Sequence, residues 1–282
     1  MAWQEIIYQY DGSFDGLLCC IYESYVNKEL PTAIVSDEEC ELSLFSIRSI
    51  TTDRDHARRI YRSLQKISPE VCPLLRRVYL TAMPDKEIAV YRFVAKLYRE
   101  GAPLLRRLSD DTYLPLLKAV RHLSREAEAL RGFLRFSDFD GVLAAEIEPK
   151  NRVLPLLRGH FCSRYHNESF FIYDRTHKEA LLYSRGVSQI TALDGFQMAA
   201  PDTAESSYRM LWRRFYETIA IRERENPKLC RSNLPLHYRS TMTEFQDTPV
   251  TRGSDAALQA PGVPDAISAP ATHREREPSA PA

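Results

Sequence analysis

The chain has 282 residues, of which 44% are hydrophobic and 10% aromatic, a composition that supports a packed core and excludes a wholly disordered protein. No apolar run approaches the roughly 18 residues needed to cross a bilayer, and the first residues lack a signal-peptide pattern. We therefore expect a cytoplasmic protein without a membrane span. The six cysteines lack C-x-x-C spacing, which indicates reduced thiols.

The formal net charge of zero hides an uneven distribution of charge. Residues 1–53 carry 2 basic and 10 acidic side chains, whereas residues 54–135 carry 18 basic and 9 acidic ones. A net-basic helical segment can face a phosphate backbone, or it can dock onto the acidic segment of the same fold. Both alternatives stay open, with the intramolecular contact slightly favoured.

The first residues predict a strand followed by a helix. Apolar residues at 6–10 indicate a short strand that ends at Asp11-Gly12, and Ser13 can cap the following helix. Residues 33–36 are a possible second strand, whereas residues 45–50 are too short to assign.

From Asp53 onward the pattern is helical. Asp53 is a plausible cap, and the helix that follows has apolar positions on one side and basic ones on the other. Prolines mark short helices or boundaries near residues 71–80. Further helices are expected at residues 85–100 and 110–130, so the N-terminal part is predicted to be mostly helical.

The pattern changes in the second part of the chain. Residues 133–136 and 142–147 flank a Ser-Asp-Phe-Asp-Gly turn and predict a hairpin. Residues 151–165 are expected to be helical, and residues 170–173 and 180–183 flank a polar connection in a second hairpin. The resulting ββαββ order predicts a four-stranded antiparallel sheet with a helix on one face.

A long last helix is predicted from about Thr203 to Arg224, ending before Asn226-Pro227. Apolar residues recur along it at helical spacing, so we expect them to be buried. These residues are Tyr208, Leu211, Trp212, Phe215 and Ile219.

Residues 247–282 contain 6 prolines, 8 alanines and no aromatic residue, which predicts a disordered tail. The preceding residues, 1–246, are expected to form one α+β domain. Its possible sub-parts are residues 1–130, mainly helical, and residues 131–246, which combine the ββαββ antiparallel sheet with the long C-terminal helix.

His160, Cys162 and His166 form the pattern closest to a metal site, since Cys162 and His166 would be i, i+4 neighbours on a helix. A third ligand would have to come from His177, His122 or a carboxylate through unknown tertiary contacts. Ordinary packing or surface placement is the stronger interpretation, so no metal is predicted.

Asp138 and Asp140, with Glu146 and Glu148 across the predicted turn, could serve carboxylate chemistry or bind a cation. The stronger interpretation is structural, because Asp favours turns and alternating Glu residues mark the solvent-exposed face of a strand. The sequence also lacks phosphate-loop, nucleophile-elbow and iron–sulfur motifs. It therefore predicts no cofactor and leaves any catalytic residue unknown.

The last helix and the residues after it are the best candidate for contact with nucleic acid. Arginine can bind phosphates, and aromatic rings can stack on bases. At helical spacing, however, such rings are more often core residues, and neighbouring glutamates offset much of the charge. The predicted nucleic-acid-binding residues are Arg209, Trp212, Arg213, Arg214, Arg222, Arg224, Lys228 and Arg231.

Two stretches resemble a bacterial family described as probable DNA metabolism proteins. YDGSFDGLL at residues 10–18 is similar to its N-terminal signature, and the stretch from LWRRFY to IRERENP at residues 211–227 resembles its C-terminal one. Residues 172–175 resemble its second hairpin, whereas residues 234–239 depart from its closing segment. The signature residues are Tyr10, Asp11, Gly12, Phe14, Gly16, Trp212, Phe215, Tyr216, Glu223, Arg224, Asn226 and Pro227.

The resemblance implies a role in DNA repair or DNA metabolism beside a radical S-adenosylmethionine (SAM) partner protein. Many members are fused to a uracil-DNA glycosylase domain, which is not expected in the residues after 246. The leading expectation is thus an accessory protein that binds DNA and this partner. The alternatives are an enzyme that acts on damaged or modified bases, and a protein-binding scaffold without nucleic-acid contact.

Overall fold

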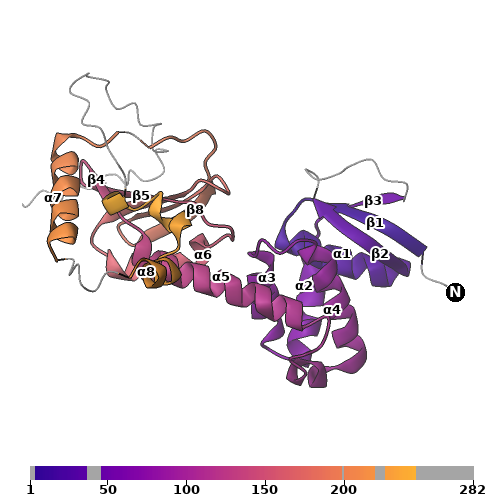
Figure 1. Ribbon diagram of the computed structural model, residues 1–282. Coiled ribbons are helices and arrows are strands. Elements are labelled where there is room, and N and C mark those ends of the chain that lie inside the picture. The colour runs from indigo at the N-terminus through magenta and orange to yellow at the C-terminus, as the bar shows by residue number, and fades with distance from the viewer. Residues whose placement is uncertain (1–3, 37–45, 199, 220–225, 246–282) are drawn as a thin grey trace, which may run out of the picture. The chain divides into compact units, whose positions relative to one another are not determined.

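The computed structural model describes residues 4–36, 46–198, 200–219 and 226–245 (Figure 1). These residues form helices and two separate sheets, which confirms the α+β class. No helix in this part of the chain is both long and apolar enough to cross a bilayer. The expected tail at 247–282 lies outside the described residues.

A three-stranded parallel sheet opens the fold, in the order β2-β1-β3. Its strands are β1 (Gln4–Tyr10), β2 (Glu29–Ser36) and β3 (Ile47–Ile50). β2 and β3 both lie parallel to β1, because a helical crossover, α1 (Phe14–Asn27), separates β1 from β2. The strands expected at 6–10 and 33–36 are confirmed. The third strand, β3, lies in the stretch 45–50 that was too short to assign from the sequence.

The signature stretch at residues 10–18 has a structural explanation. Ser13 caps α1 as expected, since its Oγ accepts a hydrogen bond from the Gly16 backbone N–H at 2.9 Å. Gly12 has a φ of +72°, and a Cβ at Gly16 would lie 2.3 Å from Oδ1 of Asp11. Both glycines are therefore required by the strand-to-helix turn.

Four helical segments follow this sheet, and in Figure 1 the helices α1, α2 and α4 lie below it. Asp53 caps the first of them as predicted, because its Oδ1 accepts from the backbone N–H groups of Asp55 and His56. Together they bury the first hydrophobic core against the sheet. The segments are α2 (Arg54–Ile67), α3 (Val71–Tyr79), α4 (Lys86–Glu100) and η2 (Ala102–Arg106).

An ion pair between Lys96 and Asp110 ties α4 to the connection that follows η2. Lys96 Nζ lies 2.6 Å from Oδ2 of Asp110, and this hydrogen bond holds the pKa of Asp110 well below its usual range. A carboxyl whose pKa is lowered by folding stabilises the fold above its unfolded pKa of about 4, and this contribution is lost as the pH falls through the folded-state pKa.

We therefore expect Asp110→Asn to be less stable than the wild type at pH 7. The difference between the two proteins should shrink as the pH is lowered below about 4, where the unfolded carboxyl becomes protonated. Urea denaturation of both proteins across this pH range measures the effect. An unchanged difference at acid pH would show that the charge of Asp110 does not matter.

The long helix α5 (Leu114–Phe133) takes part in two separate cores. Leu116 near its start belongs to the first core, whereas Leu123, Ala127 and Leu130 belong to a second one. The division of residues 1–246 near residue 130 stays a prediction.

The second sheet has five strands in the order β4-β5-β6-β7-β8. A helix, α6 (Leu154–Arg164), connects its second and third strands and packs in the second core. The strands are β4 (Ser137–Phe139), β5 (Val142–Ile147), β6 (Ser169–Asp174), β7 (Glu179–Ser184) and β8 (Val187–Ala192).

This sheet differs from the expected four-stranded antiparallel unit in two ways. β5 and β6 pair in parallel, because the intervening helix returns the chain to the same end of the sheet. β8 is an additional strand that pairs antiparallel with β7. The first hairpin is also displaced, since residues 133–136 form the end of α5 and a connection rather than a strand.

The described C-terminal part is helical. α7 (Thr203–Ile219) contacts β4, and η4 (Thr243–Phe245) contacts α7. Between them lie α8 (Pro227–Asn233) and α9 (Leu236–Arg239). The expected end of the last helix at Arg224 lies outside the described residues.

Candidate functional site

The aromatic residues predicted to be buried on α7 are exposed. Trp212 is 42% exposed and Phe215 is 52% exposed, and their ring centroids lie 5.8 Å apart. Tyr208 and Leu211 are exposed as well, at 70% and 57%. The expectation of a buried stripe is therefore wrong for these four residues, which we call the α7 aromatic face.

A polar pair near the start of α7 holds the helix to the sheet. Glu205 Oε1 accepts from Arg209 Nε at 2.8 Å, and Arg209 also donates to Oγ of Ser137 in β4. The second carboxylate oxygen of Glu205 accepts from the backbone N–H of Asp138 at 3.3 Å. The pair thus anchors the first turns of α7 to β4, whereas the residues of the α7 aromatic face stay exposed.

The predicted nucleic-acid-binding residues fall into three groups. Arg209 is held by Glu205, and Arg213 Nε donates to the backbone oxygen of Thr243 at 3.2 Å. Three basic residues are exposed and form no ion pair with another described residue: Arg214, Lys228 and Arg231. Arg222 and Arg224 lie outside the described residues, as does the signature residue Glu223. Whether these residues bind nucleic acid stays a prediction.

The basic segment at residues 54–135 makes little ionic contact with the acidic one. Among the described residues, the ion pair that joins the two segments links His56 Nδ1 to Glu23 at 3.5 Å. Four of the acidic side chains of residues 1–53, at 37–41, lie outside the described part. The intramolecular docking of the two segments therefore stays a prediction.

A groove of about 990 Å³, which no sequence pattern predicted, runs along α5. One wall is a single face of α5 that extends from Lys118 to Phe133. The other walls come from residues 81–83, from Lys150 and Asn151, and from α8 and α9. Residues from four distant parts of the sequence thus line one groove, which we call the α5 groove.

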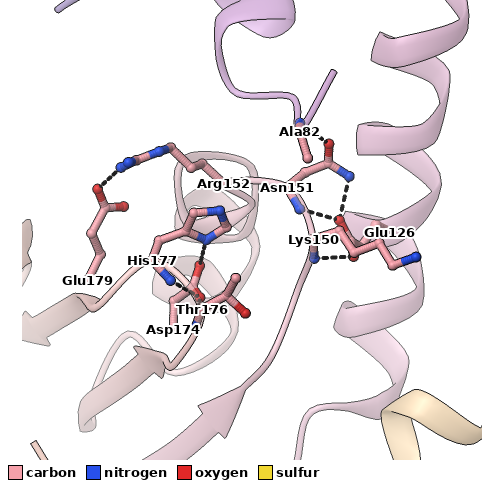
Figure 2. Close-up of polar contacts among 9 residues, drawn as sticks. All are labelled: Ala82, Glu126, Lys150, Asn151, Arg152, Asp174, Thr176, His177 and Glu179. Carbon is pink, nitrogen blue, oxygen red and sulfur yellow. Dashed lines mark hydrogen bonds and ion pairs between the residues drawn. The ribbon is translucent and has the colours of Figure 1, made fainter. Parts of the chain in front are cut away.

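A buried carboxylate holds the wall of the α5 groove together (Figure 2). Glu126 is 9% exposed and accepts hydrogen bonds from the backbone N–H groups of Lys150 and Asn151, at 2.8 and 2.9 Å. It also accepts from Nδ2 of Asn151 at 2.6 Å. Oδ1 of Asn151 in turn accepts from the backbone N–H of Ala82 at 2.8 Å. This chain of bonds fixes two loops against α5.

Basic side chains lie on the α5 groove without carboxylate partners. Lys118, Arg125 and Lys150 are exposed, and none of them forms an ion pair with another described residue. Glu128 also lines the groove, but its carboxylate accepts from Arg131 at 2.7 Å. The three cations are therefore available to an anionic ligand.

A second buried carboxylate organises the turn between β6 and β7 (Figure 2). Asp174 is fully buried, and its Oδ1 accepts from the backbone N–H groups of Thr176 and His177. Its Oδ2 lies 2.7 Å from Nδ1 of His177. An ionised carboxylate only accepts, so Nδ1 carries the proton of this bond. Beside the turn, Arg152 pairs with Glu179.

The structure does not gather the metal candidates into one site. In the described part of the chain, no group of three His, Cys, Asp or Glu residues could hold a metal ion. His166 lies beyond the end of α6, so Cys162 and His166 do not share a helix. His177 is bonded to Asp174 instead. The catalytic residues stay unknown.

The acidic residues of the first hairpin have structural roles. Asp140 has a φ of +51° and precedes Gly141, at +83°, so this pair forms the turn between β4 and β5. Oδ1 of Asp138 accepts from the backbone N–H of Gly141 at 2.8 Å. This geometry agrees with the structural interpretation of the two aspartates.

Comparison with known proteins gives a family without a known activity. No curated protein matches the chain, and no solved structure does. Residues 84–244 match the family DUF4130, described as a domain of unknown function. The match includes α5, the five-stranded sheet and α7, whereas the stretch at residues 10–18 lies outside it. Because it spans more than half of the 282 residues, the chain belongs to the DUF4130 family.

Proposed function

We propose that this protein is an accessory factor of DNA metabolism that binds nucleic acid through the α7 aromatic face. The observation that carries the proposal is the exposure of Trp212 and Phe215 on a helix that also carries the exposed Arg214. Aromatic rings next to a cation are the usual platform on which the bases of a single strand stack. Large apolar residues gathered on one exposed helix face also mark interaction surfaces in general.

The geometry of α7 favours single strands over duplexes. Stacking requires unpaired bases, whose faces are open, and the two rings of Trp212 and Phe215 are inclined by 31° to each other. Arg214 lies between these two rings in sequence and can meet the phosphates of the same strand. A short stretch of single-stranded DNA is therefore the expected ligand of this face.

The resemblance to the DNA metabolism family supports the same proposal. It implies a radical SAM protein of DNA modification or repair as the partner, and a cytoplasmic location. In this proposal the chain presents the strand and the partner supplies the chemistry. The association with uracil-DNA glycosylase domains in that family agrees with such a role.

We expect Trp212→Ala/Phe215→Ala to weaken the binding of a labelled single-stranded oligonucleotide at least about tenfold, since stacking contributes about 1 to 3 kcal/mol per base. Arg214→Glu should weaken binding and reduce its dependence on salt. Fluorescence anisotropy at several salt concentrations measures both effects. Leu108→Ala and Arg185→Glu are matched controls, because both residues are exposed and lie elsewhere.

The alternatives predict other results. No binding of single- or double-stranded DNA at low salt, with or without the partner, would contradict the nucleic-acid proposal. Co-purification with the partner alone would then favour a protein-binding scaffold. Turnover of lesion-containing oligonucleotides would favour an enzyme, and its retention in Asp138→Asn, Asp140→Asn and His166→Ala would exclude those residues as its site.

A further inference from the structure

The α5 groove has the size and composition of a small-molecule site. Its volume of about 990 Å³ lies at the upper end of the range for such pockets, roughly 300 to 1,000 Å³. Its lining combines seven apolar residues with twelve polar or charged ones, so it offers both an apolar wall and polar partners. The groove is distinct from the α7 aromatic face, none of whose residues lines it.

Charge on the groove favours an anion. Lys118 and Arg125 lie seven residues apart, two turns along one face of α5, and Lys150 approaches from the loop after β5. Among the described residues these three cations have no carboxylate partner. Glu126 forms no ion pair with them, because its oxygens accept from Lys150 N, Asn151 N and Asn151 Nδ2. With the two carboxylates of Glu126 and Glu128, the three cations leave the lining with a formal charge of +1. A phosphate is an anion that several such cations can bind together.

The apolar part of the groove suits a planar ring. Ala129 and Phe133 continue the same face of α5, and Met83 and Pro235 lie on other walls. Phe133 packs against Tyr238 with ring centroids 5.2 Å apart, so the Phe133 ring is held in place. Burial raises the pKa of Tyr238 to about 12, so this residue stays neutral at pH 7.

From this arrangement we infer that the α5 groove binds a nucleoside monophosphate, with its phosphate at Lys118, Arg125 and Lys150 and its base against Phe133. The phosphate and the base are covalently linked in such a ligand, and one face of α5 supplies Lys118 and Arg125 as well as Phe133, which lies about two turns beyond Arg125. The nucleotide can be free or can stand at the 5′ end of a DNA strand, since both present the same chemistry.

Isothermal titration of the full chain tests this assignment. We expect adenosine monophosphate to bind more tightly than either adenosine or inorganic phosphate, because only the nucleotide reaches both parts of the groove. Lys118→Glu/Arg125→Glu should weaken its binding at least about tenfold through the loss of charge-assisted hydrogen bonds. Phe133→Leu should weaken the binding of the nucleotide and leave that of phosphate unchanged.

Arg121→Glu is the matched control. Arg121 is an exposed arginine of the same helix that does not line the groove, so this variant should bind the nucleotide like the wild type. Equal thermal unfolding temperatures of the variants verify that the charge reversals leave the fold intact. Competition by a 5′-phosphorylated oligonucleotide then assigns the ligand to a strand end, and lack of competition assigns it to a free nucleotide.

Several outcomes would overturn the inference. They are the absence of nucleotide binding at millimolar concentration, equal affinity for phosphate and nucleotide, and an equal loss of binding in Arg121→Glu. Loss of nucleotide binding in Trp212→Ala/Phe215→Ala would place the ligand on α7 instead. Because the α7 aromatic face and the α5 groove share no residue, the proposal for α7 can fail while this one holds.

Discussion

Replacement of Glu126 by alanine is expected to lower the free energy of unfolding by about 3 kcal/mol, because it leaves buried N–H donors without an acceptor. The donors are the backbone N–H groups of Lys150 and Asn151 and the side-chain amide of Asn151. The loss of stability extends to a second loop, because Oδ1 of Asn151 also accepts a hydrogen bond from the backbone N–H of Ala82. Urea denaturation of Glu126→Ala and the wild type measures the difference.

Two further variants make this result specific. Glu126→Gln keeps one carbonyl oxygen as an acceptor and should lose less stability than Glu126→Ala. Glu128→Ala removes a carboxylate whose side chain is 72% exposed and pairs only with Arg131 on the same helix, so a change within about 0.5 kcal/mol is expected. Equal losses in Glu126→Ala and Glu128→Ala would contradict the role of the buried bonds shown in Figure 2.

Asp174→Ala is expected to cost about 2 to 3 kcal/mol of stability, since it removes the acceptor of three hydrogen bonds. Two of these bonds come from the backbone of the turn between β6 and β7, and the third comes from His177. The expected cost is no larger than for Glu126, because Thr176 is exposed and water can reach its N–H once the carboxylate is gone. Thermal and urea unfolding provide the measurement.

The matched control for this variant is Asp194→Ala. Asp194 also pairs with a residue of the turn, Lys178, at 2.9 Å, but its side chain is 78% exposed. An exposed pair of this kind contributes little to stability, because solvent screens it. The stability of His177→Ala should fall between those of Asp174→Ala and Asp194→Ala, since it leaves the backbone bonds to Asp174 in place. A stability of Asp174→Ala equal to that of Asp194→Ala would refute the account of this turn.

The Glu126 bonds also connect stability with the inferred ligand site. They fix Lys150 and Asn151, which form one wall of the α5 groove, against the helix that forms another. A ligand that binds only the closed arrangement would stabilise the folded state by mass action. Nucleotide should therefore raise the unfolding temperature of the wild type more than that of Glu126→Ala.

The sequence predicted those features that depend on contacts between residues close together in the chain. Ser13 and Asp53 cap their helices as expected, because an N-cap bonds to backbone groups two or three residues away. The Asp140-Gly141 turn was also predicted from the sequence, since both residues adopt a positive φ and Asp-Gly is a residue pair that favours such turns. Arg185 and Gly186 have the same geometry before β8, so this glycine was the signal that could have revealed the missed strand.

Other features depend on contacts that no local pattern encodes. Glu126 accepts a hydrogen bond from Asn151, which is 25 residues away in the sequence. Asn151 in turn accepts one from Ala82, which is 69 residues away. The sequence offers no spacing rule for such bonds, so neither the buried carboxylate nor the α5 groove could be predicted. The parallel pairing of β5 with β6 follows from the helix between them, a cue that the antiparallel prediction did not use.

The α+β class, the capped helices, the aspartate–glycine hairpin and the apolar periodicity of α7 all follow from the amino-acid sequence. The exposure of Trp212 and Phe215 depends on tertiary contacts, because periodicity defines a stripe on a helix but not what covers it. The Glu205–Arg209 pair binds the start of α7 to the sheet and leaves that stripe exposed. Likewise, only the fold brought Lys118, Arg125 and Lys150 to one groove, since their proximity depends on long-range contacts of the backbone.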